Sequence, residues 1–193
     1  MRRCLMTTLL LLALFGAGLY AWPRLMGFQS QRSEDYAETT PVFDIRRHLS
    51  GPMLAEGVIF GPTGGMSQRF VANMEGVWDG AAGRLSETFR YSSGTEQMRE
   101  WTLRLGNDGE IIGTAPDIVG EARGRQSGAT VMLRYRLRLP DTAGGHVLDV
   151  VDWLYLTEDG VILNKSVMRK FGIKVAELVA TMRPAREAEI VAE

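Results

Sequence analysis

Short runs of alternating hydrophobic and polar residues, separated by glycine-rich turns, fill most of the chain between residues 43 and 183. In the run 129–139, one face carries Ala, Val, Leu, Tyr, Leu and Leu, whereas the other face carries Thr, Met and three Arg. A period of two residues is typical of a β-strand with one buried face and one solvated face. Antiparallel sheets commonly have such a wet face, so we expect antiparallel strands.

The same pattern predicts eight to ten strands, joined by tight turns such as Asn107-Asp108-Gly109 and Glu158-Asp159-Gly160. One short helix is expected over residues 43–49. Consecutive strands without a long crossover favour an all-β fold, a single antiparallel up-and-down β-barrel of the calycin or lipocalin kind, because closure removes the sheet edges. The expected strands lie near residues 53–60, 67–78, 84–92, 96–105, 109–115, 119–126, 129–139, 146–157, 160–171 and 173–182.

The N-terminal pattern differs, because residues 4–22 are predominantly apolar and carry no charge. This run follows Met1-Arg2-Arg3, and its length is close to the roughly 20 residues that a membrane-spanning helix needs. It is either a signal peptide or an uncleaved transmembrane anchor. The poor cleavage site at Leu19-Tyr20-Ala21 favours the anchor. Because arginines mark the cytoplasmic side, we expect a single-pass protein of the bacterial inner membrane whose domain faces the periplasm.

These patterns divide the chain into four parts. Residues 1–22 form the signal anchor or signal peptide, residues 23–42 a polar linker, residues 43–183 the β-barrel domain, and residues 184–193 a polar tail. A net charge of −1 gives no basic field that would attract nucleic acid. Cys4 is the only cysteine, which excludes an internal disulfide. His48 and His146 lack the spacing of metal ligands, so neither a metal nor a cofactor is expected.

Two charged residues break the apolar faces of the hairpin 85–105. Glu87 shares a face with Leu85, Phe89 and Tyr91, and Arg99 lies on the equivalent face of the following strand. A charge buried alone is costly, whereas a hydrogen-bonded pair costs much less. We therefore expect Glu87 to lie opposite Arg99 and to pair with it inside the barrel.

This register would place Leu85 opposite Trp101 and Phe89 opposite Gln97. Two interpretations of the charged pair are open. It either fixes the register of the strands or provides a polar anchor for the carboxylate or carbonyl of a ligand. Catalysis by the Glu87 carboxylate is a third reading, which requires substrate close to it.

A second set of polar residues lies on the expected strands 146–157 and 160–171. Asp152 stands in an apolar row, and Asn164 and Lys170 share a face of the next strand, so an inward orientation would create a second internal network. An outward polar face or a register-fixing network is the alternative. The other candidate residues of the ligand-binding wall are aromatic: Trp78, Trp101 and Tyr135.

Gly120, Ala122 and Gly124 also alternate on one face, where small residues either leave room for a ligand or let the sheet coil tightly.

Several motifs in this order resemble a bacterial family described as domain of unknown function 3833, over roughly residues 45–183. The motifs are G-V-W-D-G (76–80), L-x-E-x-F-x-Y (85–91), R-x-W (99–101), G-x-A-x-D-I-V-G-x-A-x-G (113–124), D-W-x-Y-L (152–156) and L-N-x-S-x-M-x-K-F-G (163–172). The resemblance implies an uncharacterised envelope protein, often a lipoprotein. A lipoprotein cysteine would follow the hydrophobic run, whereas Cys4 lies before most of it, so a helical anchor is expected instead.

The sequence thus leads to a membrane-anchored barrel that binds a small hydrophobic or amphipathic, lipid-like molecule. The alternative is a filled barrel that serves as a structural or interaction module of the envelope. A filled barrel would contain no cavity above roughly 300 Å³, the lower end for ligand sites. An isomerase or hydrolase that uses Glu87 or Asp152 is the third and least favoured reading.

Overall fold

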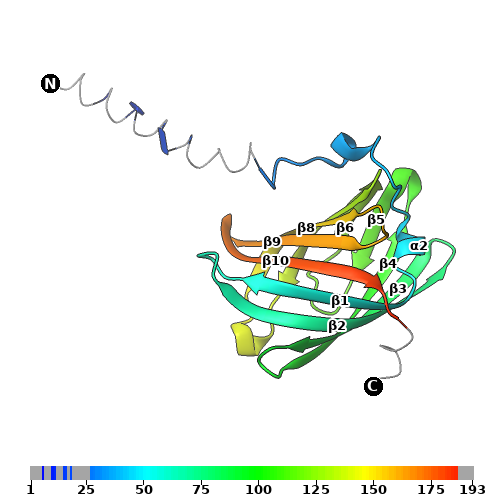
Figure 1. Cartoon of the computed structure of the whole chain (residues 1–193). Helices are drawn as coiled ribbons and strands as arrows, with labels where there is room; N and C mark the ends of the chain where they lie inside the picture. Colours follow the sequence, from blue (N-terminus) through cyan, green and yellow to red (C-terminus); the bar gives the residue numbers. More distant parts are fainter. Residues whose placement is uncertain (1–5, 7–9, 12–14, 17, 19–26, 187–193) are drawn as a thin grey trace.

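Ten antiparallel strands close into one barrel in the computed structural model, which describes residues 6, 10, 11, 15, 16, 18 and 27–186 (Figure 1). Each strand pairs with its neighbours in the chain, and the first pairs with the last. The predicted all-β, up-and-down barrel is therefore confirmed. The strands are β1 (Gly51–Phe60), β2 (Met66–Asp79), β3 (Ala82–Tyr91), β4 (Glu96–Leu105), β5 (Glu110–Thr114), β6 (Ala122–Ser127), β7 (Thr130–Arg138), β8 (Val147–Leu156), β9 (Ile162–Lys170) and β10 (Ile173–Pro184).

One end of the barrel is plugged by the chain that enters β1. The single-turn helix α2 (Ile45–His48) begins where the Asp44 side chain accepts a hydrogen bond from the Arg46 amide. Phe43, Ile45 and Leu49 are buried in the barrel core. The Trp78 indole donates to the Leu49 carbonyl over 2.8 Å and fixes the plug. The helix expected over residues 43–49 is thus present, and it closes this end.

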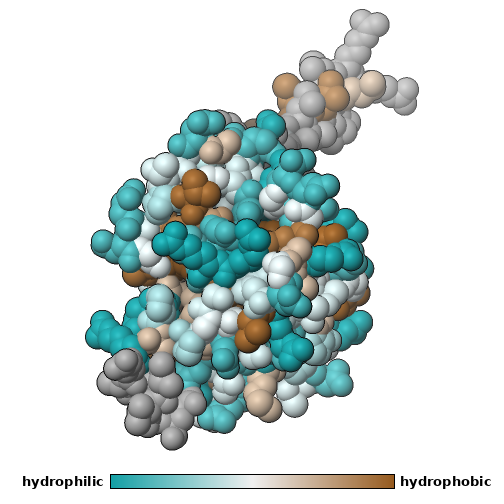
Figure 2. Space-filling model, turned by 90° about the vertical axis from the view of Figure 1, so that its right-hand side faces the viewer, coloured by the Kyte–Doolittle hydropathy of each residue, from teal (hydrophilic) through white to brown (hydrophobic). Residues whose placement is uncertain are grey.

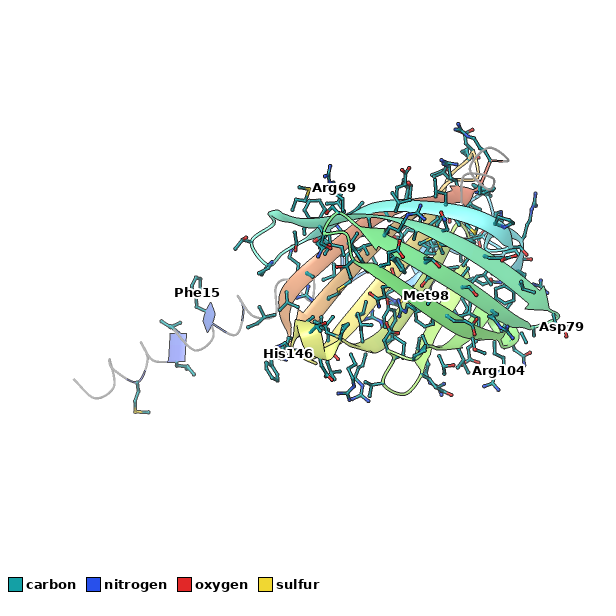
Figure 3. All side chains as sticks on the ribbon, turned by 90° about the horizontal axis from the view of Figure 1, so that it is seen from below. Phe15, Arg69, Asp79, Met98, Arg104 and His146 are labelled. Atoms are coloured by element: carbon teal, nitrogen blue, oxygen red, sulfur yellow. The ribbon has the colours of Figure 1, made fainter. Side chains whose placement is uncertain are left out.

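The opposite end of the barrel is the mouth, where the β1–β2, β3–β4, β7–β8 and β9–β10 connections lie. Figure 3 shows Arg69 and His146 at the mouth and Asp79 and Arg104 at the plugged end. Three short 3-10 helices, η1 (Ser33–Tyr36), η2 (Asn107–Gly109) and η3 (Asp141–Ala143), complete the described elements. The side shown in Figure 2, to the right in Figure 1, has separate hydrophobic residues among hydrophilic ones.

The segment before the plug packs on the outside of β8. Trp153 points outward from the barrel and is still fully buried, because the Tyr36 ring covers it edge-on at 5.3 Å between centroids. The Tyr155 hydroxyl donates to Gln31 over 2.8 Å. Residues 27–42, which we interpreted as a linker, therefore run along the barrel, since aromatic side chains on both partners exclude water from their contact.

The predicted anchor lies mainly outside the described residues, as does the tail from residue 187. In the parts of the chain that the structure describes, no helix is long and apolar enough to cross a membrane.

Candidate ligand site at the barrel mouth

A cavity of about 390 Å³ enters the barrel from its mouth. It is larger than the roughly 300 Å³ that marks the lower end for ligand sites, so the barrel is hollow in this half. The half next to α2 is filled by the hydrophobic core. Its walls include apolar and polar side chains. The apolar ones are those of Ile59, Phe89, Leu148, Met168 and Leu178, and the polar ones are those of Gln97, Arg99, Asp117 and Lys170.

The register of β3 and β4 confirms the predicted alignment of the two charged residues. Glu87 pairs with Arg99, and Phe89 pairs with Gln97 along the same ladder. Both charged side chains point into the barrel, where Glu87 is only 8% exposed. The reason is the strand period, since residues two apart share a face and the neighbours of Glu87 form the core.

The expected ion pair between Glu87 and Arg99 is wrong in one respect, because the guanidinium turns to Asp117. The Arg99 Nε atom donates to Asp117 Oδ1 over 3.1 Å. Asp117 comes from the β5–β6 connection, which folds back to the mouth through a bridge between Ile118 and Leu137. Asp117 was not among the predicted site residues, because no local pattern in the sequence shows that this connection meets β4.

Arg99 and Glu87 each keep one buried polar atom without a partner. Across the described residues, neither Arg99 Nη2 nor Glu87 Oε2 has a hydrogen bond. The guanidinium lies 4.4 Å from the ring centroid of Trp101 and 6.0 Å from that of Tyr135. These two aromatic rings hold the guanidinium by cation–π contact without saturating its donors.

Burial raises the pKa of Glu87 to about 7, because the charged carboxylate loses its hydration. The positive charge of Arg99 opposes this effect, whereas Asp152 and Asp117 add to it. Below pH 7 the Glu87 carboxyl is therefore mainly neutral and carries a proton that it can donate.

Asp152 is the centre of a second internal network, as the sequence suggested. Ser166 Oγ donates to it over 2.7 Å, Tyr135 Oη over 3.3 Å, and the Asn164 amide makes a short hydrogen bond. Burial raises the pKa of Asp152, and these donors act in the opposite direction. All the carboxylate contacts are internal, so the network stabilises the pairing of β7, β8 and β9.

The structure separates two of the predicted wall residues from this network. Lys170 stands at the rim of the cavity, where its Nζ atom lies 2.7 Å from His146 Nδ1. Trp78 lies at the plugged end and does not line the cavity, because its indole is held by the plug. The apolar wall residues and His146 were missed, although the alternation that revealed Glu87 also places Phe89 inside.

A larger concavity of about 670 Å³ lies outside the barrel, across outward-facing residues of β1, β2, β3 and β10 such as Val58, Val71 and Val179. It is open to solvent and has no buried unpaired polar group. The mouth cavity combines apolar walls with a buried unpaired polar atom, Nη2 of Arg99, so it is the candidate site. In the described ranges, no three His, Cys, Asp or Glu side chains are grouped to hold a metal ion.

The fold thus defines a closed antiparallel barrel, an architecture that can hold a small ligand or be filled by its own side chains. The chain belongs to the family described as protein of unknown function (DUF3833), whose model matches residues 23–184. A comparison with curated proteins finds no match.

Solved structures share the fold at low sequence identity. The S-type phycobiliprotein lyase CPES from Guillardia theta superposes with a TM-score of 0.57 at 9% identity, covering 81% of this chain and 99% of that one. Rv2717c from M. tuberculosis superposes with a TM-score of 0.54 at 16% identity, covering 77% of this chain and 100% of that one. At these identities the likeness establishes the barrel architecture alone.

Proposed function

We propose that this domain binds a small amphipathic, lipid-like molecule in the mouth cavity. The apolar part of the ligand packs against Phe89, Leu148 and Met168, and its polar head, a carboxyl or carbonyl group, accepts a hydrogen bond from Arg99. The domain carries out this binding at the bacterial inner membrane, on the periplasmic side, tethered by the N-terminal apolar run.

The observation that carries this proposal is the unpartnered Nη2 atom of Arg99, a residue that lines the apolar cavity, together with a second unpartnered atom, Oε2 of Glu87, on the neighbouring strand. A buried donor without an acceptor costs about 1–3 kcal/mol. A ligand oxygen that accepts a hydrogen bond from Arg99 would recover that energy, and the apolar wall would add about 25 cal/mol for each Å² removed from water. A site that only fixed strand register would gain stability by pairing these atoms internally, as the Asp152 network does.

The Asp117 carboxylate limits the charge of the head group. It neutralises Arg99 from one side, so a ligand carrying two or more negative charges would meet net repulsion at the base of the cavity. A fatty acid or a lipid carbonyl fits this balance better than a phosphomonoester does. Neither Glu87 nor Asp152 lines the cavity, so the geometry favours binding over acid–base catalysis at these carboxylates.

The test uses the full chain, purified in maltoside micelles and transferred to amphipol. Organic extraction followed by mass spectrometry identifies any co-purified amphiphile, and displacement of a fluorescent polyene fatty acid measures affinity. Arg99→Met should weaken binding roughly tenfold, the equivalent of one charge-assisted hydrogen bond. Arg104→Met, on the outward face of the same strand, is the matched control and should bind as the wild type does.

Because loss of Arg99 also leaves Asp117 unpaired, a second variant separates binding from folding. Ala176→Trp places a large side chain in the cavity, where Ala176 is a lining residue, and should abolish binding while the barrel still melts cooperatively. The absence of any bound or displaceable amphiphile in the wild type would refute the proposal. It would leave the filled-barrel alternative, an envelope interaction module.

A further inference from the structure

The turn between β9 and β10 combines backbone strain with exposed hydrophobic surface. Phe171 and Gly172 form its two central residues with φ angles of 52° and 80°, and Lys170 pairs with Ile173 across it. A positive φ at both positions is the twist-matched hairpin geometry that Asn-Gly adopts readily, whereas a bulky side chain there is a conformational outlier. Phe171 is 87% exposed and Ile173 is 69% exposed, so the strained residue buries nothing within the domain.

This turn lies at the rim of the cavity. Lys170 lines the opening, and the adjacent β1–β2 connection adds Met66, which is 62% exposed. Figure 1 shows both turns at the same end of the barrel, opposite α2. Basic side chains at this end include Arg138 and Lys170, which line the cavity, and Arg69, which Figure 3 labels at the mouth. The acidic Glu177 on β10 is already paired with Lys165 and Lys174.

The first part of the continuously described chain, at Gln29, lies close to the same turn. The Gln29 side chain lies beside the Arg169 guanidinium, whose Nη1 atom donates to the Gly172 carbonyl over 3.2 Å. Trp22, the last residue of the run, is seven residues earlier, and seven residues span at most about 25 Å. A membrane that held the run would therefore lie within that distance of Gln29.

We propose that the β9–β10 turn inserts into the surface of the bilayer that holds the N-terminal run, so that the cavity opens onto lipid. This inference rests on the proposed function and names the source of the ligand. The exposed rim would lie in the interfacial zone of an anionic membrane, where aromatic side chains partition and basic residues contact headgroup phosphates. Insertion would bury the apolar surface that compensates for the strained turn, and the ligand would pass from bilayer to barrel without crossing water.

The experiment places a fluorophore on the turn of the full chain in vesicles of phosphatidylcholine and phosphatidylglycerol. In a Cys4→Ser background, Phe171→Cys is labelled with an environment-sensitive nitrobenzoxadiazole dye. Asp159→Cys, in the exposed β8–β9 turn at the plugged end, is the matched control. The dye at 171 should shift to the blue and be quenched by lipids spin-labelled near the headgroup, whereas the dye at 159 should do neither.

Two outcomes would overturn the inference. If the dye at 171 stays as solvent-exposed as the dye at 159, the rim does not touch the membrane. If it shifts to the blue without quenching by labelled lipid, the rim is covered by protein, either a second copy or another partner. Both readings are obtained without any ligand, so they hold even if the cavity binds nothing.

A second variant preserves the geometry of the β9–β10 turn and removes only the aromatic side chain that would insert into the membrane. Phe171→Asn creates the favoured Asn-Gly turn, so the melting temperature should be unchanged or higher. Transfer of the fluorescent fatty acid from vesicles into the barrel should become roughly tenfold slower, reflecting the loss of one buried aromatic side chain. Equilibrium affinity in amphipol should not change, whereas Arg99→Met should lower that affinity. An unchanged transfer rate would refute a role of the turn in lipid entry.

Discussion

The ionisation of Glu87 gives the most discriminating test of the site. Its pKa is raised from an ordinary value of 4.5 to about 7 in the folded protein, because burial disfavours the carboxylate. The folded state therefore binds the proton more tightly than the unfolded state does. By linkage, the contribution of Glu87 to stability is most favourable below about pH 4.5, declines as the pH rises, and reaches its lowest level above about pH 7.

The size of this effect follows from the same two values. At 1.36 kcal/mol for each pKa unit, the difference in stability between the two limits is about 3 kcal/mol. Glu87→Gln removes the titration and keeps the shape of the side chain. The unfolding free energy of this variant minus that of the wild type should therefore rise by about 3 kcal/mol between pH 4 and pH 8. Asp152 titrates in both proteins, so its contribution cancels.

Urea unfolding of the full chain in maltoside micelles, followed by tryptophan fluorescence at each pH, measures this difference. A Gln amide adds its own constant offset, so the slope with pH is the informative quantity. Glu75→Gln, on the outward face of the neighbouring strand β2, is the control and should show no such slope. A flat difference would show that Glu87 is not desolvated. A difference that falls as the pH rises would show that Glu87 is charged, has a lowered pKa and stabilises Arg99.

Three further outcomes test the packing around the site. Gly124→Ala should destabilise the barrel by at least about 2 kcal/mol, because a Cβ atom there would lie 1.9 Å from a backbone oxygen of β7. Gly61→Ala, where the nearest atom would be 3.8 Å from the added Cβ, is the control and should be tolerated. The urea midpoints of the two variants provide the comparison. Tyr36→Ala should cost about 2 kcal/mol or more and shift tryptophan emission to the red, since it uncovers Trp153. Ser166→Ala removes a hydrogen bond to the buried carboxylate of β8 and should cost about 1.5–3 kcal/mol at pH 7, measured by the same unfolding assay.

The strands and their order could be derived from the sequence because each rests on local information. Alternation over two residues identifies a strand and its faces without knowledge of its partners. Tight glycine turns then leave antiparallel pairing with the next strand as the natural arrangement, and this pairing predicts the observed alignment of Glu87 with Arg99. The same alternation placed Asp152 in an apolar row, but it left open whether Asn164 points inward or outward.

What the sequence left open depends on distances between segments far apart in the chain. Asp117 reaches Arg99 only because the β5–β6 connection folds back over the mouth. Trp78 lies outside the cavity only because its indole is bound to the plug at the other end of the barrel. Gly124 illustrates the same division. Its small size was visible in the sequence, but only the approach of the Met132 carbonyl shows that it serves close strand packing rather than ligand space. Alternation is a property of neighbours along the chain, whereas a cavity is the volume that remains after all the strands have closed, and that volume is decided by the tertiary structure.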